Sequence, residues 1–369
     1  MKMRSIAGIL VLFMLAVMAA ACQKAVPTTK TVTLDDQVNE IVNSMTVPEK
    51  VGQLVMIGIQ GIEINDDSRY MLNQYHIGGV ILFDRNLQTA EQTRKLTADL
   101  QAQADKVPLL VGIDEEGGPV VRGKHFITPP PSAQSLGTAG IEDNTKAESW
   151  AQKTGNQLRD LGFNVNFAPV ADVGDNPRNY SANPQVTAKF VSAAVQGYES
   201  SHVICTLKHF PGIGQGKVDS HVDRSVIPVE EAGLWNRELL PFAEVINNHS
   251  SENYMVMVSH LIYPAIDDSP ASMSSKIMTD LLRQEMHFTG VIVTDDLEMG
   301  AVSKYGSFRD LGVQAIRAGA DMVMVCHEYP HETDVYLGLL DAVEKGDIRI
   351  DRIDESVKRI VKMKLLHQQ

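Results

Sequence analysis

The stretch Val203-Ile-Cys-Thr-Leu-Lys-His-Phe210 starts as a continuous apolar run and ends close to a lysine and a histidine. An apolar run of strand length, without alternation between apolar and polar residues, is typical of a parallel strand buried on both faces. The same pattern recurs along the chain. The other runs are Leu54–Ile59, Gly79–Phe83, Leu109–Asp114, Phe163–Pro169, Met255–His260, Val291–Asp295 and Met322–Cys326.

Amphipathic stretches of helical length alternate with these runs, and Thr46-Val-Pro-Glu49 has the pattern of a helix-starting capping box. The predicted helices are Gln88–Gln103, Asn144–Leu161, Val186–Ser200, Val229–Ile246, Ser274–Met286, Phe308–Ala318, Glu332–Glu344 and Ile350–Leu366. Eight strands alternating with helices over ~340 residues predict an α/β protein, a single (β/α)8 TIM-type barrel. The alternative is a doubly wound open sheet, but Gly58-Ile-Gln-Gly61 lacks the third glycine and the following helix of a nucleotide-binding loop.

The composition is that of a globular protein. The chain has 369 residues, 44% hydrophobic and 21% charged, which leaves no room for a sizeable second domain beside a barrel. Its formal net charge of −13 argues against a nucleic-acid partner, because phosphate binding needs a basic surface. Cys205 and Cys326 lie inside apolar runs, so we expect buried thiols there. We also expect a monomer.

The first residues have a different character from the rest of the chain. Lys2 and Arg4 precede an apolar segment and three alanines, which is the pattern of a signal peptide over residues 1–21. Cys22 follows directly and resembles the lipidated cysteine of bacterial lipoproteins, although Ala19 stands where that motif usually has leucine. We therefore predict an exported lipoprotein anchored to a membrane through Cys22, with a tether over 22–33 and the catalytic domain over 34–369. Ordinary cleavage after Ala21 is the alternative.

Polar residues gather where the predicted strands end. In a (β/α)8 barrel the active site lies at the carboxyl ends of the strands. Six of the eight runs end in, or lead to, a charged or histidine side chain, and these are Asp84, Asp114, Asp172, Lys208 with His209, His260, and Asp295. Folding does not require charges at these positions, so together they predict a functional site at one rim of the barrel.

The loop after Phe210 is rich in glycine and carries the pair Asp219-x-His221. A carboxylate two residues from an imidazole can orient the ring and raise its basicity, as acid/base chemistry requires. Zinc binding by His209, Asp219 and His221 is the rival chemistry, but their spacing matches no common zinc motif. We expect neither a metal nor a cofactor.

Asp295 ends the seventh run while still inside the predicted strand, so it is a candidate nucleophile, whereas Asp296 could equally be a helix N-cap. Retaining glycoside hydrolysis needs one group that attacks the anomeric carbon and another that protonates the leaving oxygen. Asp295 can be the first group, and His221, supported by Asp219, can be the second. An imidazole, with an ordinary pKa of ~6.5, can serve as both acid and base near neutral pH.

Several of these segments resemble glycoside hydrolase family 3, and most closely its β-N-acetylglucosaminidase branch. They are Gly78–Phe83, Gly112–Gly118, Asn166–Asp172, Lys208–Gly212 with Asp219-Ser-His221, and Val293–Met299. The resemblance implies a retaining exo-enzyme that removes terminal β-linked N-acetylglucosamine from peptidoglycan fragments or related oligosaccharides. It implies Asp295 as the nucleophile that forms the covalent intermediate, and His221 with Asp219 as the acid/base dyad. It implies substrate binding by Asp114, Arg122, Lys208, His209 and, in a shortened segment, Arg178.

The chain departs from the family pattern at Ile213, where a second histidine is common, and around Arg178, where the segment is several residues short. Three alternatives stay open. They are another family 3 β-glycosidase such as a β-glucosidase, transfer of the sugar to phosphate instead of water, and a sugar-binding lipoprotein without catalysis. The presence of Asp295, Asp219 and His221 argues against the last of these.

Overall fold

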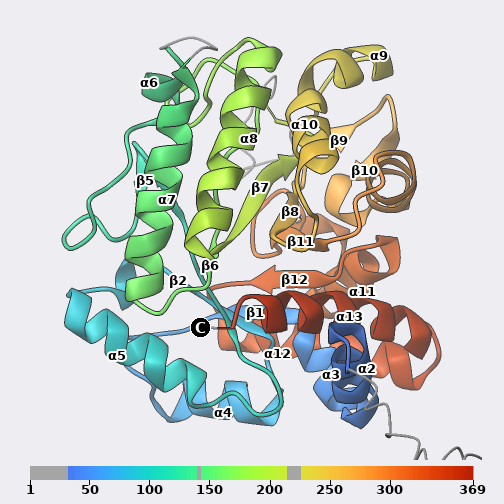
Figure 1. Cartoon of the computed structure of the whole chain (residues 1–369). Helices are drawn as coiled ribbons and strands as arrows, with labels where there is room; N and C mark the ends of the chain where they lie inside the picture. The colour runs from blue at the N-terminus through green and yellow to red at the C-terminus, as the bar shows by residue number, and fades with distance from the viewer. Residues whose placement is uncertain (1–31, 139–142, 214–225, 369) are drawn as a thin grey trace, which may run out of the picture. The chain divides into compact units, whose positions relative to one another are not determined.

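The computed structural model of the chain describes residues 32–138, 143–213 and 226–368 (Figure 1). The predictions for Cys22, the signal peptide, Asp219 and His221 therefore lie outside the described residues. The chain divides into residues 1–37 and residues 38–369. In the first part, Thr33 and Asp36 bond to each other at the start of a helix.

Eight parallel strands form a closed barrel in the order β1-β12-β11-β8-β7-β6-β3-β2. Their bounds are β1 Val55–Gly58, β2 Gly79–Leu82, β3 Leu110–Ile113, β6 Val165–Asn166, β7 Ile204–Phe210, β8 Tyr254–Val258, β11 Val291–Asp296 and β12 Met322–Val325. Because β1 pairs with both β2 and β12, the barrel closes and the open doubly wound sheet is excluded. The predicted (β/α)8 fold is confirmed. Every barrel strand lies in one of the predicted apolar runs except for the first residue of β8, Tyr254, and the last residue of β11, Asp296.

Helices surround the barrel (Figure 1). The α-helices are α2 Leu34–Ser44, α3 Val47–Gln53, α4 Asp66–Gln74, α5 Ala90–Gln101, α6 Ala133–Gly137, α7 Thr145–Asp160, α8 Pro184–Ser201, α9 Glu231–Gly233, α10 Leu240–Asn248, α11 Phe308–Ala318, α12 Tyr329–Glu344 and α13 Ile350–Leu366. Short 3-10 turns cover Asp84–Asn86, Ala271–Met273 and Ser303–Tyr305, and π-helical segments cover Leu234–Glu238 and Lys276–Glu285. The bounds of α11 and α13 match the prediction.

Two helical predictions need correction. The single helix expected over Val229–Ile246 is divided into α9, a π-helical segment and α10. A helix also follows the first strand, contrary to our expectation, because Asn65 and Ser68 form a capping box that starts α4. This helix buries only three side chains and therefore has little apolar periodicity to reveal it in the sequence.

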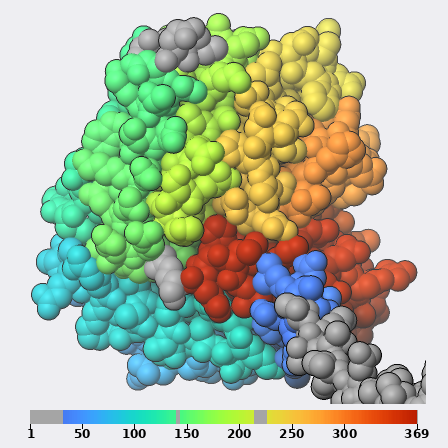
Figure 2. Space-filling model, in the orientation of Figure 1, coloured from blue at the N-terminus to red at the C-terminus, as the bar shows by residue number. Residues whose placement is uncertain are grey.

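Helix α3 packs beside α13, the last helix of the chain. Thr46 and Glu49 form the predicted capping box of α3, with the Thr46 amide donating to the Glu49 carboxylate at 2.6 Å. Helix α3 contacts α13, and Figure 2 shows the blue of α3 beside the red of α13. Among the described helices, none is long and apolar enough to cross a membrane.

The barrel interior is packed with apolar side chains, as in other barrels of this type. Methionine is prominent among them, and the cluster includes Met56, Met255, Met257, Met322 and Met324 together with Phe167 and Cys326. Cys205 and Cys326 are both buried and free, as predicted. This packed core leaves the carboxyl ends of the strands as the place where polar groups can meet.

A register shift near the end of β7 brings two consecutive side chains to the same place. From Leu207 to Phe210 this strand advances three residues while its partner β8 advances two. In a regular strand, neighbouring side chains point to opposite faces. With the shift, Lys208 and His209 both line the cavity described below.

A similar register shift occurs near the end of β11. From Val293 to Asp296 this strand advances three residues while its partner β12 advances two. Val293 points into the barrel interior, so alternation directs Asp295 toward the barrel mouth. The shift adds Asp296 to the cavity wall instead of turning it toward the helices.

Candidate active site

A cavity of about 750 Å³ opens at the carboxyl ends of the barrel strands. Its charged and histidine residues are Asp114, Glu116, Arg122, Asp172, Arg178, Lys208, His209, Asp295, Asp296, Glu298 and His327. The six predicted site residues that fall within the described chain, namely Asp114, Arg122, Arg178, Lys208, His209 and Asp295, all line it. These six residues therefore come together in one place, whereas the strand-end residues Asp84 and His260 are not among those that line the cavity.

Lys208 is the centre of a buried ion cluster. Its Nζ lies 2.8 Å from Asp114 Oδ1 and 2.6 Å from Glu116 Oε1. Arg178 holds the same Glu116 carboxylate with two hydrogen bonds of 2.8 Å, from Nε and Nη2. Both carboxylates raise the pKa of Lys208 against the opposing effect of its burial, so the ammonium stays charged. The cluster presents fixed donors and acceptors, which suits recognition of sugar hydroxyls.

Glu116 was not singled out in the sequence, although it follows Asp114 by two residues. It reaches the cavity because Glu115–Gly117 and Val120–Val121 form a small hairpin, β4 and β5, directly after the third strand. A hairpin at this point could not be read from an apolar run. The signal available was the acidic cluster Asp114-Glu-Glu116 itself, at a strand end.

We expect Glu116→Gln to destabilise the protein by about 3 kcal/mol at neutral pH. Burial would raise the pKa of Glu116, but the charges of Lys208 and Arg178 outweigh it and lower the pKa to about 2. A lowered carboxyl pKa contributes stability above the ordinary value of 4.5, and this contribution is lost as the pH falls toward 2. Urea unfolding at pH 7 and at pH 3 should therefore show a smaller difference between variant and wild type at pH 3. A difference that is the same at both pH values would contradict the assignment.

Asp172 links His209 to the start of the glycine-rich loop. One of its carboxylate oxygens lies 2.7 Å from His209 Nδ1, and the other accepts the backbone amides of His209 and Ile213 at 3.1 and 2.9 Å. Burial opposes ionisation of Asp172, yet His209 lowers the pKa of this carboxyl. The ionised carboxylate keeps the proton on Nδ1 and so fixes the orientation of the ring. The sequence placed Asp172 at a strand end without giving it this role.

Asp295 is held as a carboxylate at the mouth of the barrel. Its Oδ1 accepts the amide of Asp296 at 2.9 Å. Burial would raise its pKa, but the charges of His209 and His260 and the hydrogen bond from Asp296 lower the pKa below the ordinary value. Asp295 is therefore ionised at neutral pH, as a nucleophile must be.

Arg122 is the least tightly paired cation of the cavity wall. Its two terminal nitrogens each lie 3.4 Å from a carboxylate oxygen, one of Asp84 and one of Asp114. Its Nε is buried and has no hydrogen-bond partner. A guanidinium with such long contacts has donors available for a ligand, in line with the predicted substrate-binding role.

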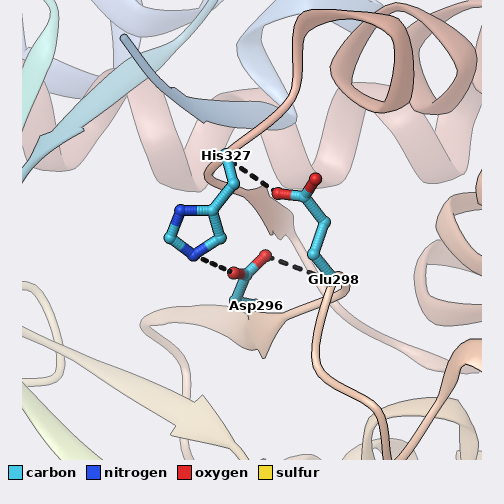
Figure 3. Close-up of side chains that lie close together, drawn as sticks. All are labelled: Asp296, Glu298 and His327. Atoms are coloured by element: carbon cyan, nitrogen blue, oxygen red, sulfur yellow. Dashed lines mark hydrogen bonds and ion pairs between the residues drawn. The ribbon is translucent and has the colours of Figure 1, made fainter. Parts of the chain in front are cut away.

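Asp296, Glu298 and His327 form a cluster at the cavity wall, and the sequence analysis missed the last two (Figure 3). Glu298 lies two residues beyond the end of β11, and His327 is the residue directly after the eighth apolar run, Met322–Cys326. Candidate ligand atoms of all three lie within 4.8 Å of one another, as a metal site would require. However, Nδ1 of His327 lies 3.1 Å from Nη1 of Arg85, which can only donate, so the ring proton belongs on Nε2. A metal would need a lone pair there, and we therefore assign none.

Comparisons with known proteins show which family the chain belongs to. The sequence profile described as glycosyl hydrolase family 3 N terminal domain matches residues 46–363. The chain therefore belongs to glycosyl hydrolase family 3. A solved structure of a glycoside hydrolase family 3 β-N-acetylglucosaminidase from a Paenibacillus strain superimposes with a TM-score of 0.85, at 40% sequence identity over 88% of this chain.

Two curated relatives are named beta-hexosaminidases. The chain is 35% identical to beta-hexosaminidase A of Pseudoalteromonas piscicida over 80% of its own length, and 35% identical to a beta-hexosaminidase of Nitrosomonas eutropha over 77%. It spans 83% of the Nitrosomonas protein. It spans only 54% of the Pseudoalteromonas protein and 63% of the Paenibacillus chain.

Proposed function

We propose that the protein is a retaining exo-β-N-acetylglucosaminidase that removes terminal β-linked N-acetylglucosamine from peptidoglycan fragments or related oligosaccharides. The observation that carries the proposal is the ionised carboxylate of Asp295, set beside Lys208 and His209 in a cavity at the carboxyl ends of a family 3 barrel. The names of the relatives support the sugar specificity.

In the first step, a free oxygen of Asp295 attacks the anomeric carbon, and the bond to the leaving oxygen breaks. Asp114, Arg122, Arg178, Lys208 and His209 bind the hydroxyls of the sugar and hold the anomeric carbon over Asp295. Ion pairs fix Asp114, Arg178, Lys208 and His209 before substrate arrives, so binding by these four requires little reorganisation. The product of this step is a glycosyl ester on Asp295.

The leaving oxygen must receive a proton, and the carboxylates of Glu116 and Asp172 are poor donors. Lys208 and Arg178 keep Glu116 ionised, and His209 keeps Asp172 ionised. We assign the proton to His221, oriented by Asp219, as the Asp219-x-His221 pair and the resemblance to family 3 imply. In the second step His221 takes a proton from water, the water oxygen attacks the anomeric carbon, and Asp295 is released.

We further propose that residues 1–21 are a signal peptide and that Cys22 is lipidated, so that the enzyme works at the cell envelope. Mass spectrometry of the protein purified from cells tests this directly. A diacylglyceryl or triacylated Cys22 at the N-terminus is the expected result. An unmodified N-terminus at Cys22 would indicate ordinary cleavage after Ala21.

The experiment that tests the activity is release of 4-nitrophenol from two aryl β-glycosides, the N-acetylglucosaminide and the glucoside. We expect selective cleavage of the N-acetylglucosaminide, with the β-anomer as the first product by proton NMR. Cleavage of the glucoside instead would assign the protein to another branch of the family. Formation of a sugar phosphate in phosphate buffer would show that phosphate, and not water, accepts the sugar.

A further inference from the structure

We propose that Arg85 and His327 form a positioning relay that fixes Asp296 and, through the Asp296 amide, the carboxylate of Asp295. This inference rests on the proposed function of Asp295 as nucleophile. Neither Arg85 nor His327 belongs to the predicted substrate-binding set. Both are positioning residues in this proposal, because they act on the reacting carboxylate only through Asp296.

Asp296 is held from every side. Its amide donates to Asp295 Oδ1 at 2.9 Å, and its carbonyl accepts from Nε2 of the buried His260 at 2.9 Å. On its carboxylate, Oδ1 accepts the Glu298 amide at 3.1 Å, and Oδ2 lies 3.2 Å from Nε2 of His327. The peptide that donates to Asp295 therefore has its direction set by contacts at both the backbone and the side chain of Asp296.

Arg85 decides which nitrogen of His327 carries the proton. Nη1 of Arg85 lies 3.1 Å from Nδ1 of the ring, and a guanidinium has donors only. Nδ1 must accept, so Nε2 carries the hydrogen and donates to Asp296. The hydrogen bond to Asp296 raises the pKa of His327, and the charge of Arg85 opposes that rise. The neutral ring satisfies both partners, whereas a doubly protonated ring would lose the contact with Arg85.

The guanidinium of Arg85 is itself fixed. Its Nη2 donates to the carbonyl of Cys326 at 2.7 Å, its Nε donates to the carbonyl of Ile59 at 3.2 Å, and its central carbon lies 4.6 Å from the ring centre of Phe83. Gly58 leaves room for this arrangement, because a Cβ there would lie 1.9 Å from the Cys326 carbonyl and 2.9 Å from Nη2 of Arg85. The relay thus joins the ends of β1, β2, β12 and β11.

Glu298 holds the backbone of His327 in place (Figure 3). One of its carboxylate oxygens accepts the amides of Cys326 and His327 at 2.9 and 2.6 Å, and the other lies 2.6 Å from Nδ1 of His331. The side chain of His327 is about half exposed, at 47%, so packing alone does not fix it. Its position depends on Glu298 for the backbone and on Arg85 and Asp296 for the ring.

Two substitutions of His327 separate its two contacts. A glutamine places its amide near Nε2 of the histidine and can still donate to Asp296, whereas an asparagine ends near Nδ1 and cannot. We expect His327→Asn to lower kcat about ten- to hundredfold with KM changed less than about threefold, because misplacing a nucleophile acts on the transition state. His327→Gln should retain kcat within about threefold of wild type. Equal losses in both variants, or a loss confined to KM, would overturn the relay.

His249 is the matched control. Its Nδ1 also lies 3.2 Å from a carboxylate, that of Glu199, and its Nε2 lies 2.9 Å from Ser192 Oγ, away from the cavity. We expect His249→Gln to keep kcat within about twofold, even where it lowers the melting temperature. A kcat loss as large as that of His327→Asn would mean that the effect is a general one of partnered histidines, and would overturn the proposal.

A second measurement does not depend on turnover. Nitrogen-15 NMR of the histidine rings at pH 8, with His327 assigned by its absence in His327→Gln, should show a proton on Nε2 and none on Nδ1. A proton on Nδ1 would overturn the relay even if the enzyme is active. If wild type cleaves neither aryl glycoside, the proposed function fails, while this tautomer still decides whether Arg85 and His327 are joined as proposed.

Discussion

Asp295→Asn is expected to lower kcat for the aryl N-acetylglucosaminide by about four orders of magnitude or more, the scale seen when a covalent nucleophile is removed. The amide has the same shape as the carboxylate but lacks the charge and nucleophilicity needed to attack the anomeric carbon. The hydrogen bond from the Asp296 amide to Oδ1 can survive, so the fold should be intact. Release of 4-nitrophenol measures the rate, and thermal unfolding measures the fold.

The control for this variant is Asp105→Asn, which makes the same chemical change at an exposed position. Its kcat should stay within about twofold of wild type. Near-normal activity of Asp295→Asn would refute the nucleophile assignment. A mass increase of wild type by one glycosyl residue during slow turnover, absent in Asp295→Asn, would identify the ester directly.

His221→Ala is expected to have the second largest effect, and the size of that effect should depend on the leaving group. An alkoxide leaving group, as in a disaccharide, needs a proton as the bond breaks, whereas 4-nitrophenolate is already a stable anion. We expect kcat/KM to fall about 10³-fold or more for a natural disaccharide and about tenfold for the aryl glycoside. Sugar release from the two substrates, followed by chromatography and absorbance, gives the comparison.

Equal losses for both substrates would count against His221 as the acid. Asp219→Asn should show the same dependence on the leaving group with smaller losses, since it only orients the ring. His209→Ala offers a sharper contrast, because His209 also pairs with an aspartate, Asp172, inside the cavity. A strong dependence on the leaving group in His209→Ala, and none in His221→Ala, would transfer the acid role to His209.

The barrel could be predicted because its strands are buried on both faces. Continuous runs such as Val203–Phe210 and Met322–Cys326 report burial directly, and their alternation with helices leaves few topologies. The π-helical segments at Leu234–Glu238 and Lys276–Glu285 could not be predicted, because their side-chain periodicity differs little from that of an α-helix over so short a length. The short helix α4 was missed for the related reason that its apolar face is small.

The sequence could predict those site residues that stand directly at the ends of the predicted strands. Asp114, Lys208, His209 and Asp295 stand at such ends, and each lines the cavity. The rest depends on tertiary contacts. Glu116 reaches the cavity through a hairpin. Arg85 and His327 are 242 positions apart, and they follow β2 and β12, which lie on either side of β1 only because the barrel closes.

The paired register shifts in β7 and β11 make this site sensitive to the length of the chain as well as to its chemistry. At each shift, one strand has one residue more than the partner segment that it pairs with. The extra residue lies next to Lys208 and His209 where β7 pairs with β8, and next to Asp295 and Asp296 where β11 pairs with β12. Deletion of Thr294 would give β11 and β12 the same number of residues across the paired segment. It would remove no functional side chain from the sequence. It would nevertheless move Asp295 by one step and turn it away from the substrate. During divergence of such barrels, an insertion or deletion at these two strand ends can therefore abolish activity in a chain that still has every motif.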